Sequence, residues 1–334
     1  MDARYVIGVD GGNSKTDYFL FGLDGRFVDH LNAGTCSHER FPDGYDSACR
    51  IMDEQLRKLL GRNGLRMADV AAGAFGLAGA DVPSQKERLG RVVERLGFAR
   101  YAVDNDSFLG VKAGSARGYG VCSINGSGTV AGGIAPDGSR LQIGGIGSEL
   151  AGDEAGGFYL ARRVLRAVYD ALYRLGPATS MTEPVLALLE VPARERFMEY
   201  AAEGSVKRTL PNTALMRILF AAADAGDEAA VAIVAHSAKQ LAHSVAGCLA
   251  HLDFGDEPVD VVLAGSVWVK AESPLLLERF KRHVAELSPQ RCSYMVLQVP
   301  PATGAVLWAL ELAHGRPAGA DMRRAVIASV TGRP

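Results

Sequence analysis

A short glycine-rich segment near the N-terminus combines residue types that could bind a phosphate. After an apolar run, the chain reads Asp10, Gly11, Gly12, Asn13, Ser14, Lys15 and Thr16 before it becomes apolar again. Glycines let backbone N–H groups approach an anion, and the amide, hydroxyl and ammonium groups that follow add donors. Asp10 could hold a hydrated divalent cation that bridges to the phosphate. Taken alone, the segment could equally be a turn with a solvated lysine.

A second segment of the same character occurs about 115 residues later. It contains Gly126, Ser127, Gly128 and Thr129 and, like the first, lies between two apolar runs that are followed by an Asp-Gly turn and a third run. The matched patterns, over 5–33 and 120–145, predict two three-stranded meanders in two domains of similar topology. Each bend leads into a strand rather than a helix, unlike a Walker A loop or a dinucleotide fingerprint. Two such bends facing each other could clamp one polyphosphate.

The rest of the chain alternates short apolar runs with helical patterns, which predicts a mixed α/β fold. We expect strands at 70–81, 101–106 and 259–268, and short helices within 181–224. Longer helices are expected at 46–62, 84–97, 151–176, 227–252 and, as the final helix, 302–315. The predicted domains are 1–116 and 117–334, with a hinge near 112–120, and the last helix could pack back on the first domain.

Composition favours a small-molecule partner. Lys and Arg total 36 against 38 Asp and Glu, a net charge of -2, so no broad basic surface is available for nucleic acid or an anionic membrane. The start lacks a leader-like pattern, and no apolar run is long enough to span a bilayer. The five cysteines are an odd number without a C-x-x-C pair, which favours reduced thiols in a cytoplasmic protein.

Six short motifs occur in an order that resembles a known family. They are DGGNSKTD, GLAGAD, NDSF, NGSGTV, GGIGSELAGDEAGG and AGSVW, which span the chain from Tyr5 to about Gly315. Their order and spacing resemble the BadF/BadG/BcrA/BcrD-type ATPase family, and most of all its N-acetylglucosamine kinase branch. The resemblance implies two ribonuclease-H-like domains, as in actin and the heat-shock ATPases, with ATP and Mg²⁺ in the cleft between them. It also implies a homodimer.

The resemblance assigns the nucleotide and metal residues. Asp10 would hold Mg²⁺ through water. The ATP-binding residues would be Gly11, Gly12, Asn13, Ser14, Lys15 and Thr16 in the first bend, Gly126, Ser127, Gly128 and Thr129 in the second, and Gly265, Ser266 and Val267 in AGSVW. On its own, AGSVW would be interpreted as an ordinary strand end in a core.

Asp106, in VDNDSF, matches the acid that takes the proton from the sugar hydroxyl in these kinases. An acid at the carboxyl end of a strand is well placed for that role. A rival interpretation is that Asp104 or Asp106 caps the helix that follows. We expect a structural role for Asp104 and the catalytic one for Asp106.

The resemblance implies a sugar site built by GLAGAD and GGIGSELAGDEAGG, with Ser127 beside it. The residues are Gly79, Asp81, Ser127, Gly145, Ile146 and Asp153. Asp153 is suited to accept hydrogen bonds from sugar hydroxyls, although a helix start would also favour an acid there. Gly79 and Asp81 could instead simply form a turn, and the role of Glu154 stays open.

Three positions depart from the N-acetylglucosamine kinase pattern. Ile146 stands where Trp is common, Val130 where Asn follows the second phosphate loop, and His38, after Ser37, near where another Asn meets the sugar. Losing an aromatic platform and two amides should alter recognition of the acetamido group. The sequence therefore predicts intact phosphate handling beside a different sugar pocket.

The leading hypothesis is an ATP-dependent kinase for the 6-hydroxyl of N-acetylglucosamine or a relative such as glucosamine. The alternative is an ATPase activator of a 2-hydroxyacyl-CoA dehydratase or benzoyl-CoA reductase, which would need cysteines placed to share an iron–sulfur cluster between subunits. A third hypothesis is an ATP- and sugar-binding protein without turnover.

Two other groups of residues are not expected to form a site. His236, His243 and His251 are spaced too widely for one metal, and Arg162, Arg163 and Arg166 are interpreted as a solvated helical face.

Overall fold

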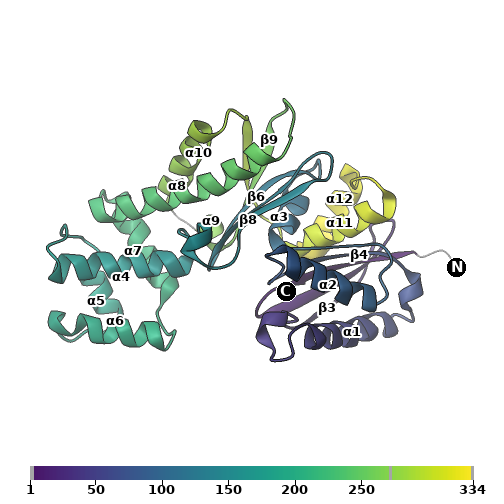
Figure 1. Cartoon of the computed structure of the whole chain (residues 1–334), viewed down its shortest axis with the longest axis horizontal. Coiled ribbons are helices and arrows are strands. Elements are labelled where there is room, and N and C mark those ends of the chain that lie inside the picture. The colour runs from purple at the N-terminus through teal and green to yellow at the C-terminus, as the bar shows by residue number, and fades with distance from the viewer. Residues whose placement is uncertain (1–3, 271–272, 332–334) are drawn as a thin grey trace.

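The computed structural model describes residues 4–270 and 273–331 and is built on two five-stranded mixed sheets (Figure 1). The first sheet contains β1 (Tyr5–Gly11), β2 (Lys15–Gly22), β3 (Phe27–Gly34), β4 (Val70–Leu77) and β5 (Tyr101–Asp104). The second contains β6 (Gly120–Asn125), β7 (Thr129–Ile134), β8 (Arg140–Gly144), β9 (Val259–Ala264) and β10 (Cys292–Val296). Both predicted meanders are confirmed.

The two sheets have the same internal order. The first runs β3-β2-β1-β4-β5 and the second β8-β7-β6-β9-β10. In each, the opening three strands pair antiparallel, and the first strand of the meander pairs parallel with the next one along the chain. Each glycine-rich bend therefore follows the carboxyl end of a central strand, the position where α/β folds place ligand-binding groups.

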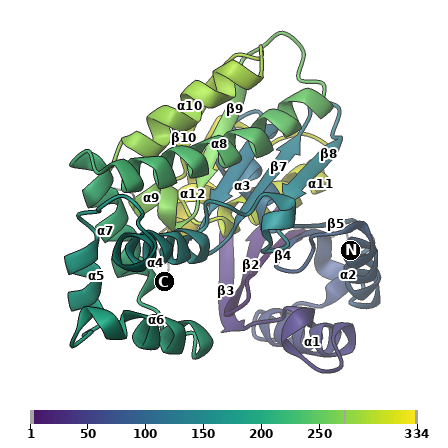
Figure 2. The same ribbon diagram turned by 60° about the vertical axis from the view of Figure 1, so that its left-hand side comes forward.

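The helices form layers on both sides of each sheet (Figure 2). Their bounds are α1 (Tyr45–Gly61), α2 (Pro83–Arg95), α3 (Asp106–Gly114), α4 (Gly157–Tyr173), α5 (Thr182–Leu188), α6 (Phe197–Val206), α7 (Asn212–Asp224), α8 (Glu228–His251), α9 (Ser266–Lys270), α10 (Leu275–Leu287), α11 (Ala302–His314) and α12 (Ala320–Thr331). Short 3₁₀ turns lie at His38–Arg40, Met67–Asp69, Glu149–Ala151 and Arg194–Arg196. Helices α4 to α7 gather beside the second sheet.

Alternation along the strands divides the buried side chains between layers. In β1, Ile7 and Val9 pack against α1 and α2, whereas Val6 faces α11 and α12. In β6, Val121 packs toward α8, whereas Cys122 joins the layer that contains α3 and α11. One apolar core therefore lies between the two sheets and contains side chains from both.

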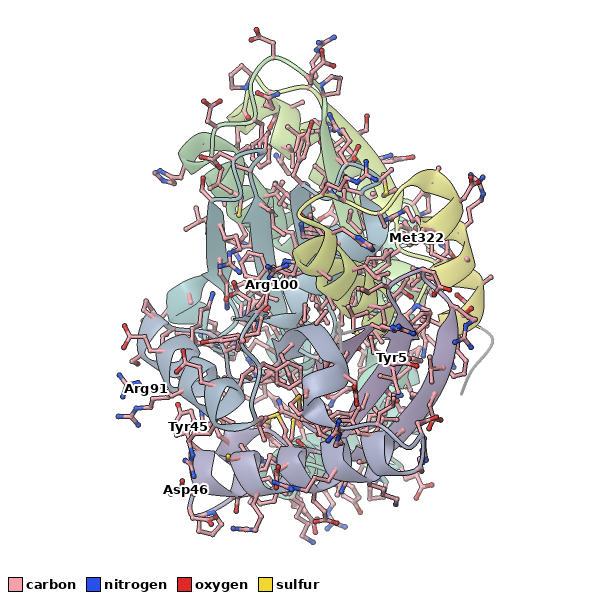
Figure 3. All side chains as sticks on the ribbon, turned by 90° about the vertical axis from the view of Figure 1, so that its right-hand side faces the viewer. Tyr5, Tyr45, Asp46, Arg91, Arg100 and Met322 are labelled. Atoms are coloured by element: carbon pink, nitrogen blue, oxygen red, sulfur yellow. The ribbon has the colours of Figure 1, made fainter. Side chains whose placement is uncertain are left out.

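The first and last parts of the chain are joined through α3, α11 and α12. Helix α3 contacts β6 and β7 of the second sheet, whereas α11 contacts β1 and β4 of the first. Arg100 donates to the carbonyl oxygens of Leu312 and Ala313 at the end of α11, and Figure 3 shows Arg100 and Met322 on this face. The last two helices thus pack on the sheet formed by the first hundred residues, and the boundary at 116 and 117 stays a prediction.

Several expected element boundaries differ from the structure, among them the strand expected over 70–81, which ends at Leu77. The strand expected over 101–106 ends at Asp104, and the cap of α3 is Asn105, whose side chain accepts from Ser107 N–H, so neither aspartate caps the helix. The helix expected from 151 begins at Gly157, because a 3₁₀ turn and an irregular segment come first. The strand expected within 259–268 ends at Ala264 and enters a bend at Gly265, as expected, before α9 begins. The helix at 302–315 is not the final one, because α12 follows it.

Candidate functional site

A cavity of about 460 Å³ brings the predicted motifs together. Asn13 of the first bend and the whole second bend line it, as does Asp106. The predicted sugar residues Gly79, Asp81, Gly145 and Asp153 line the same cavity. Side chains from both sheets therefore meet in one space large enough for a sugar and part of a polyphosphate.

The first bend is a tight hairpin with its donors at the tip. Gly12 N–H donates to Lys15 O (2.9 Å), and the hydroxyl of Thr35 donates to Gly12 O (2.8 Å). Asn13, Ser14 and Lys15 are exposed, and the Lys15 ammonium lies 3.0 Å from the Asp17 carboxylate. Thr16 is buried, and its hydroxyl accepts from Cys36 N–H, so Thr16 does not reach the cavity.

Asp10 and Asp106 form a pair of partly buried carboxyl groups at the ends of β1 and β5. Burial, and after it the charge of Asp106, raise the pKa of Asp10 to about 7 despite the opposing effects of Lys15 and the Ala302 N–H of α11. Burial and the charge of Asp81 raise the pKa of Asp106 to about 6. Two close carboxyl groups that resist ionisation are suited to a proton acceptor and a cation site.

The second bend is held by the first residues of α4 and by the segment that precedes it. Gly157 N–H donates to Gly126 O (2.8 Å) and Phe158 N–H to Ser127 O (3.1 Å). Asp153 accepts from the Thr129 hydroxyl at 3.1 Å, and burial raises the pKa of this carboxyl. Asp153 therefore lies in the irregular segment before α4 rather than at the helix start, so the helix dipole does not account for it.

The adenosine motif lies beside the second bend. A second cavity, of about 520 Å³, is lined by Gly126, Ser127 and Ser266, and a third, of about 450 Å³, by Ser266 and Val267. Gly265 lies against the backbone of Asn125, so the end of β9 adjoins the end of β6. The arrangement leaves room for a base and ribose next to the second bend.

The three departures from the kinase pattern occupy different places. Val130 lines the main cavity and is nearly buried. Ile146 is 51% exposed and does not line the cavity. His38 is buried, stacks on Tyr45 with ring centroids 4.1 Å apart, and lies beside Gly79 at the edge of the site.

Several residues near the site were not predicted. Gln142 on β8 and Asn105 both donate to Asp81, and Arg140 pairs with Asp104 at 3.0 Å. Lys86 also pairs with Asp104, which confirms the structural role expected of that residue. Arg162 lines the cavity rather than only a solvated helical face. The alternation of side chains along β8 predicts which face of the sheet Arg140 and Gln142 occupy. Their contacts with Asp104 and Asp81 could not be predicted, because they depend on how the second sheet packs against the first part of the chain.

Glu154 lies outside the cavity. It is 2.7 Å from the His236 ring and within 3.3 Å of the Tyr159 hydroxyl. The pair lines a different hollow between α4 and α8. Glu154 therefore does not line the cavity that contains Asp81 and Asp153.

The donor set suits a cation held through water. Among residues 4–270 and 273–331, no three His, Cys, Asp or Glu side chains are grouped to bind a metal directly. Burial and the charge of Asp106 raise the pKa of Asp10, and a bound Mg²⁺ would favour the ionised form of this carboxyl group. The five cysteines are free thiols, and no described helix is long and apolar enough to cross a membrane.

Two kinases are similar to this chain in sequence. An N-acetylmuramic acid/N-acetylglucosamine kinase of Clostridium acetobutylicum is 26% identical over 79% of this chain and 85% of its own length. An N-acetyl-D-glucosamine kinase of Dictyostelium discoideum is 26% identical over 72% of this chain and 78% of its own.

Among solved structures, a candidate N-acetylglucosamine kinase from Chromobacterium violaceum has a TM-score of 0.63 at 22% identity. The match covers 94% of this chain and all of that one. The likeness confirms the predicted α/β fold with two mixed sheets. The model of the BadF/BadG/BcrA/BcrD ATPase family matches residues 7–309, and the chain belongs to that family.

Proposed function

We propose that the protein is an ATP-dependent kinase that phosphorylates the 6-hydroxyl of an amino sugar, N-acetylglucosamine or a close relative such as glucosamine. The observation that carries this proposal is the single cavity lined by both bends, Asp106 and the predicted sugar residues. Both curated relatives are named as N-acetylglucosamine kinases, one of them also for N-acetylmuramic acid.

Asp106 is the proposed catalytic base. It accepts the proton of the sugar hydroxyl as that oxygen attacks the γ-phosphorus, the bond to the β–γ bridging oxygen breaks, and ADP leaves without a covalent intermediate. Its raised pKa of about 6 keeps it ionised at neutral pH yet basic enough to take a proton. Asp153 and Asp81 accept hydrogen bonds from other hydroxyls and orient the sugar.

The two bends are the proposed phosphate clamp. The Gly126 N–H donates to Gly128 O within the bend, so the backbone N–H groups of Ser127 to Thr129, with Asn13 and Ser14 opposite, would bind the phosphates. Ser266 and Val267 would adjoin the adenosine. Lys15 adds a positive charge beside them. Asp10 would hold Mg²⁺ through water, and the ion would neutralise charge on the transferred phosphoryl group. Thr16, being buried, would support the bend rather than touch ATP.

We further propose that residues 1–116 and 117–334 work as two ribonuclease-H-like domains in a cytoplasmic homodimer. Free thiols support a reducing compartment. Four of the five cysteines are buried in the cores, where they could not share a cluster with a second subunit, so the cysteines favour the kinase over the activator.

The test is a coupled ADP-release assay with MgATP and each of N-acetylglucosamine, glucosamine, N-acetylmuramic acid and glucose. We expect sugar-dependent ADP release with at least one amino sugar, and little with glucose. Asp106→Asn should abolish it. ADP release that no sugar stimulates would refute the kinase, and iron in protein purified without air would favour the activator.

A further inference from the structure

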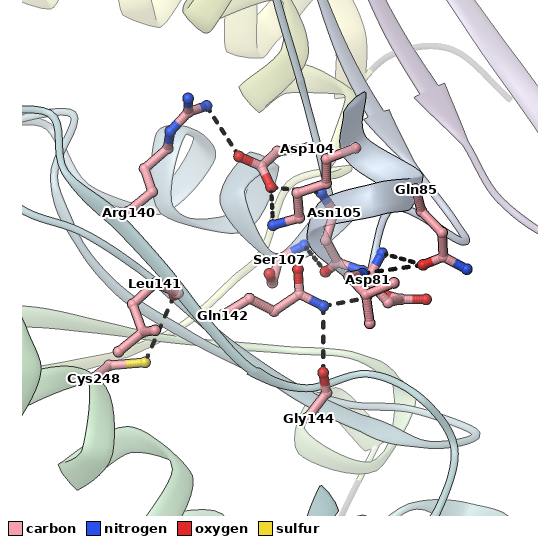
Figure 4. Close-up of polar contacts among 12 residues, drawn as sticks. Asp81, Gln85, Asp104, Asn105, Ser107, Arg140, Leu141, Gln142, Gly144 and Cys248 are labelled. Carbon is pink, nitrogen blue, oxygen red and sulfur yellow. Dashed lines mark hydrogen bonds and ion pairs between the residues drawn. The ribbon is translucent and has the colours of Figure 1, made fainter. Parts of the chain in front are cut away.

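One hydrogen bond in the cavity wall joins a side chain of the second sheet to the loop between β4 and α2. Gln142 lies on β8, an edge strand of the second sheet, and its Nε2 donates to Asp81 Oδ1 (3.1 Å) and to Gly144 O (3.3 Å) (Figure 4). Both partners of the Gln142 amide are oxygen acceptors, so its NH₂ group must face them. In the flipped orientation, the amide oxygen of Gln142 would face two other oxygens with no hydrogen between them.

The same oxygen of Asp81 accepts a second hydrogen bond. Asn105 Nδ2 donates to Asp81 Oδ1 at 2.8 Å, and Asn105 also caps the helix that Asp106 begins. Within the described residues, no donor lies in hydrogen-bonding range of Asp81 Oδ2. Since Asp81 lines the cavity, two donors on one oxygen leave the other available to a ligand.

Gly145 covers the Asp81–Gln142 hydrogen bond. A Cβ at Gly145 would lie 2.7 Å from Gln142 Nε2 and 3.0 Å from Asp81 Oδ1, and the backbone φ of +95° also disfavours a side chain. The Gly145 N–H donates to Thr129 O in the second bend. The bond is therefore part of the cavity wall, joined to the phosphate-binding bend.

Resting on the proposed kinase function, we propose that Gln142 is a positioning residue for the sugar. By holding Asp81 Oδ1, it directs Oδ2 into the cavity as an acceptor for a substrate hydroxyl or amine. Because Gln142 lies on β8 and Asp81 lies in the loop between β4 and α2, the acceptor is oriented only while the second sheet lies against that loop.

The charge around Asp81 makes this role measurable. Glu39 and Asp106 are the acids that face Asp81, and Lys86 is the cation. Burial raises the pKa of Asp81, whereas the hydrogen bond from Gln142 lowers it, followed by that from Asn105. Removing the Gln142 donor should therefore raise the pKa of Asp81 further.

The first test compares Gln142→Ala and Gln142→Glu with a matched control, Arg140→Gln on the same strand. The control removes the ion pair from β8 to Asp104 of β5 and leaves the hydrogen bonds to Asp81 in place. We expect KM for the amino sugar to rise about tenfold in Gln142→Ala and more in the isosteric Gln142→Glu, because a carboxylate would face Asp81. The KM for ATP should stay within about twofold, and the control should keep its sugar KM. Equal rises in all three variants, or none in Gln142→Ala, would overturn the proposal.

The second test needs no sugar. In protein labelled with ¹³C at the aspartate carboxyls, the Asp81 resonance, assigned with Asp81→Asn, is titrated in wild type and the variants. A higher pKa in Gln142→Ala and Gln142→Glu, with a smaller change in Arg140→Gln, is expected. An unchanged pKa in both Gln142 variants refutes the role of Gln142, whereas absence of turnover with every sugar refutes the proposed function instead.

Discussion

Replacing Asp106 by Asn should abolish turnover and yet stabilise the folded protein. Asn cannot accept the proton of the sugar hydroxyl, so we expect kcat to fall by about 10² to 10⁴. The folded protein raises the pKa of this carboxyl from 3.8 to about 6, mainly through burial. Above pH 6 the carboxylate is ionised in both states, but its charge costs more free energy in the folded state than in the unfolded one. Each unit of difference in pKa lowers the free energy of unfolding by about 1.4 kcal/mol.

The pKa of Asp106 differs by roughly two units between the folded and unfolded states, and water in the cleft reduces the corresponding energy. We therefore expect Asp106→Asn to raise the free energy of unfolding by about 2 kcal/mol at pH 7.5. The gain should shrink toward pH 5, where the folded protein already carries the neutral acid. Urea unfolding at the two pH values measures it, with Asp256→Asn, an exposed site, as control. Unchanged kcat would refute Asp106 as the base, and a less stable variant would refute the electrostatic reasoning.

Three further changes test other parts of the structure. Wild-type kcat/KM should rise as pH increases through about 6, because the base must be ionised, and an acid limb below pH 5 would contradict the pKa assigned to Asp106. Gly304→Ala should destabilise the protein by about 3 kcal/mol in urea unfolding, since its Cβ would lie 1.9 Å from Leu109 O, whereas Gly61→Ala, in open space near the end of α1, should be neutral or slightly stabilising. Ile146→Trp should lower KM for N-acetylglucosamine about two- to tenfold by supplying an aromatic surface, and an unchanged KM would place Ile146 outside the sugar site.

Local patterns were sufficient to predict the two meanders and their bends. In β1 and β2, and again in β6 and β7, successive side chains point to opposite faces of the sheet. Each face packs against a different layer of helices. Boundaries failed where side chains compete with regular structure. Asn105 caps α3 and so ends β5 early, and the Ser148 side chain stabilises a turn before α4 by accepting from Leu150 N–H.

The candidate site was predicted less completely, because part of it depends on contacts between sheets. Asp106, Asp81 and Asp153 were found through motifs, and the cavity brings them together. Gln142 and Arg140 carry no motif, and their partners lie about 40 to 60 positions away, Asp104 at the end of β5 and Asp81 in the loop after β4. The placement of Thr16 in the interior likewise depends on Cys36, which the turn pattern could not indicate.

Because α11 and α12 pack on the first sheet, that sheet cannot complete its folding until the end of the chain has been synthesised. The face of that sheet that contains Val6, Phe19 and Phe21 is covered by helices that are synthesised last. A growing chain must keep this apolar face out of contact with other proteins until translation is nearly complete, a situation that favours aggregation or chaperone binding. A fragment that ends at residue 116 would expose the same face permanently, so separate expression of the first half should yield insoluble protein.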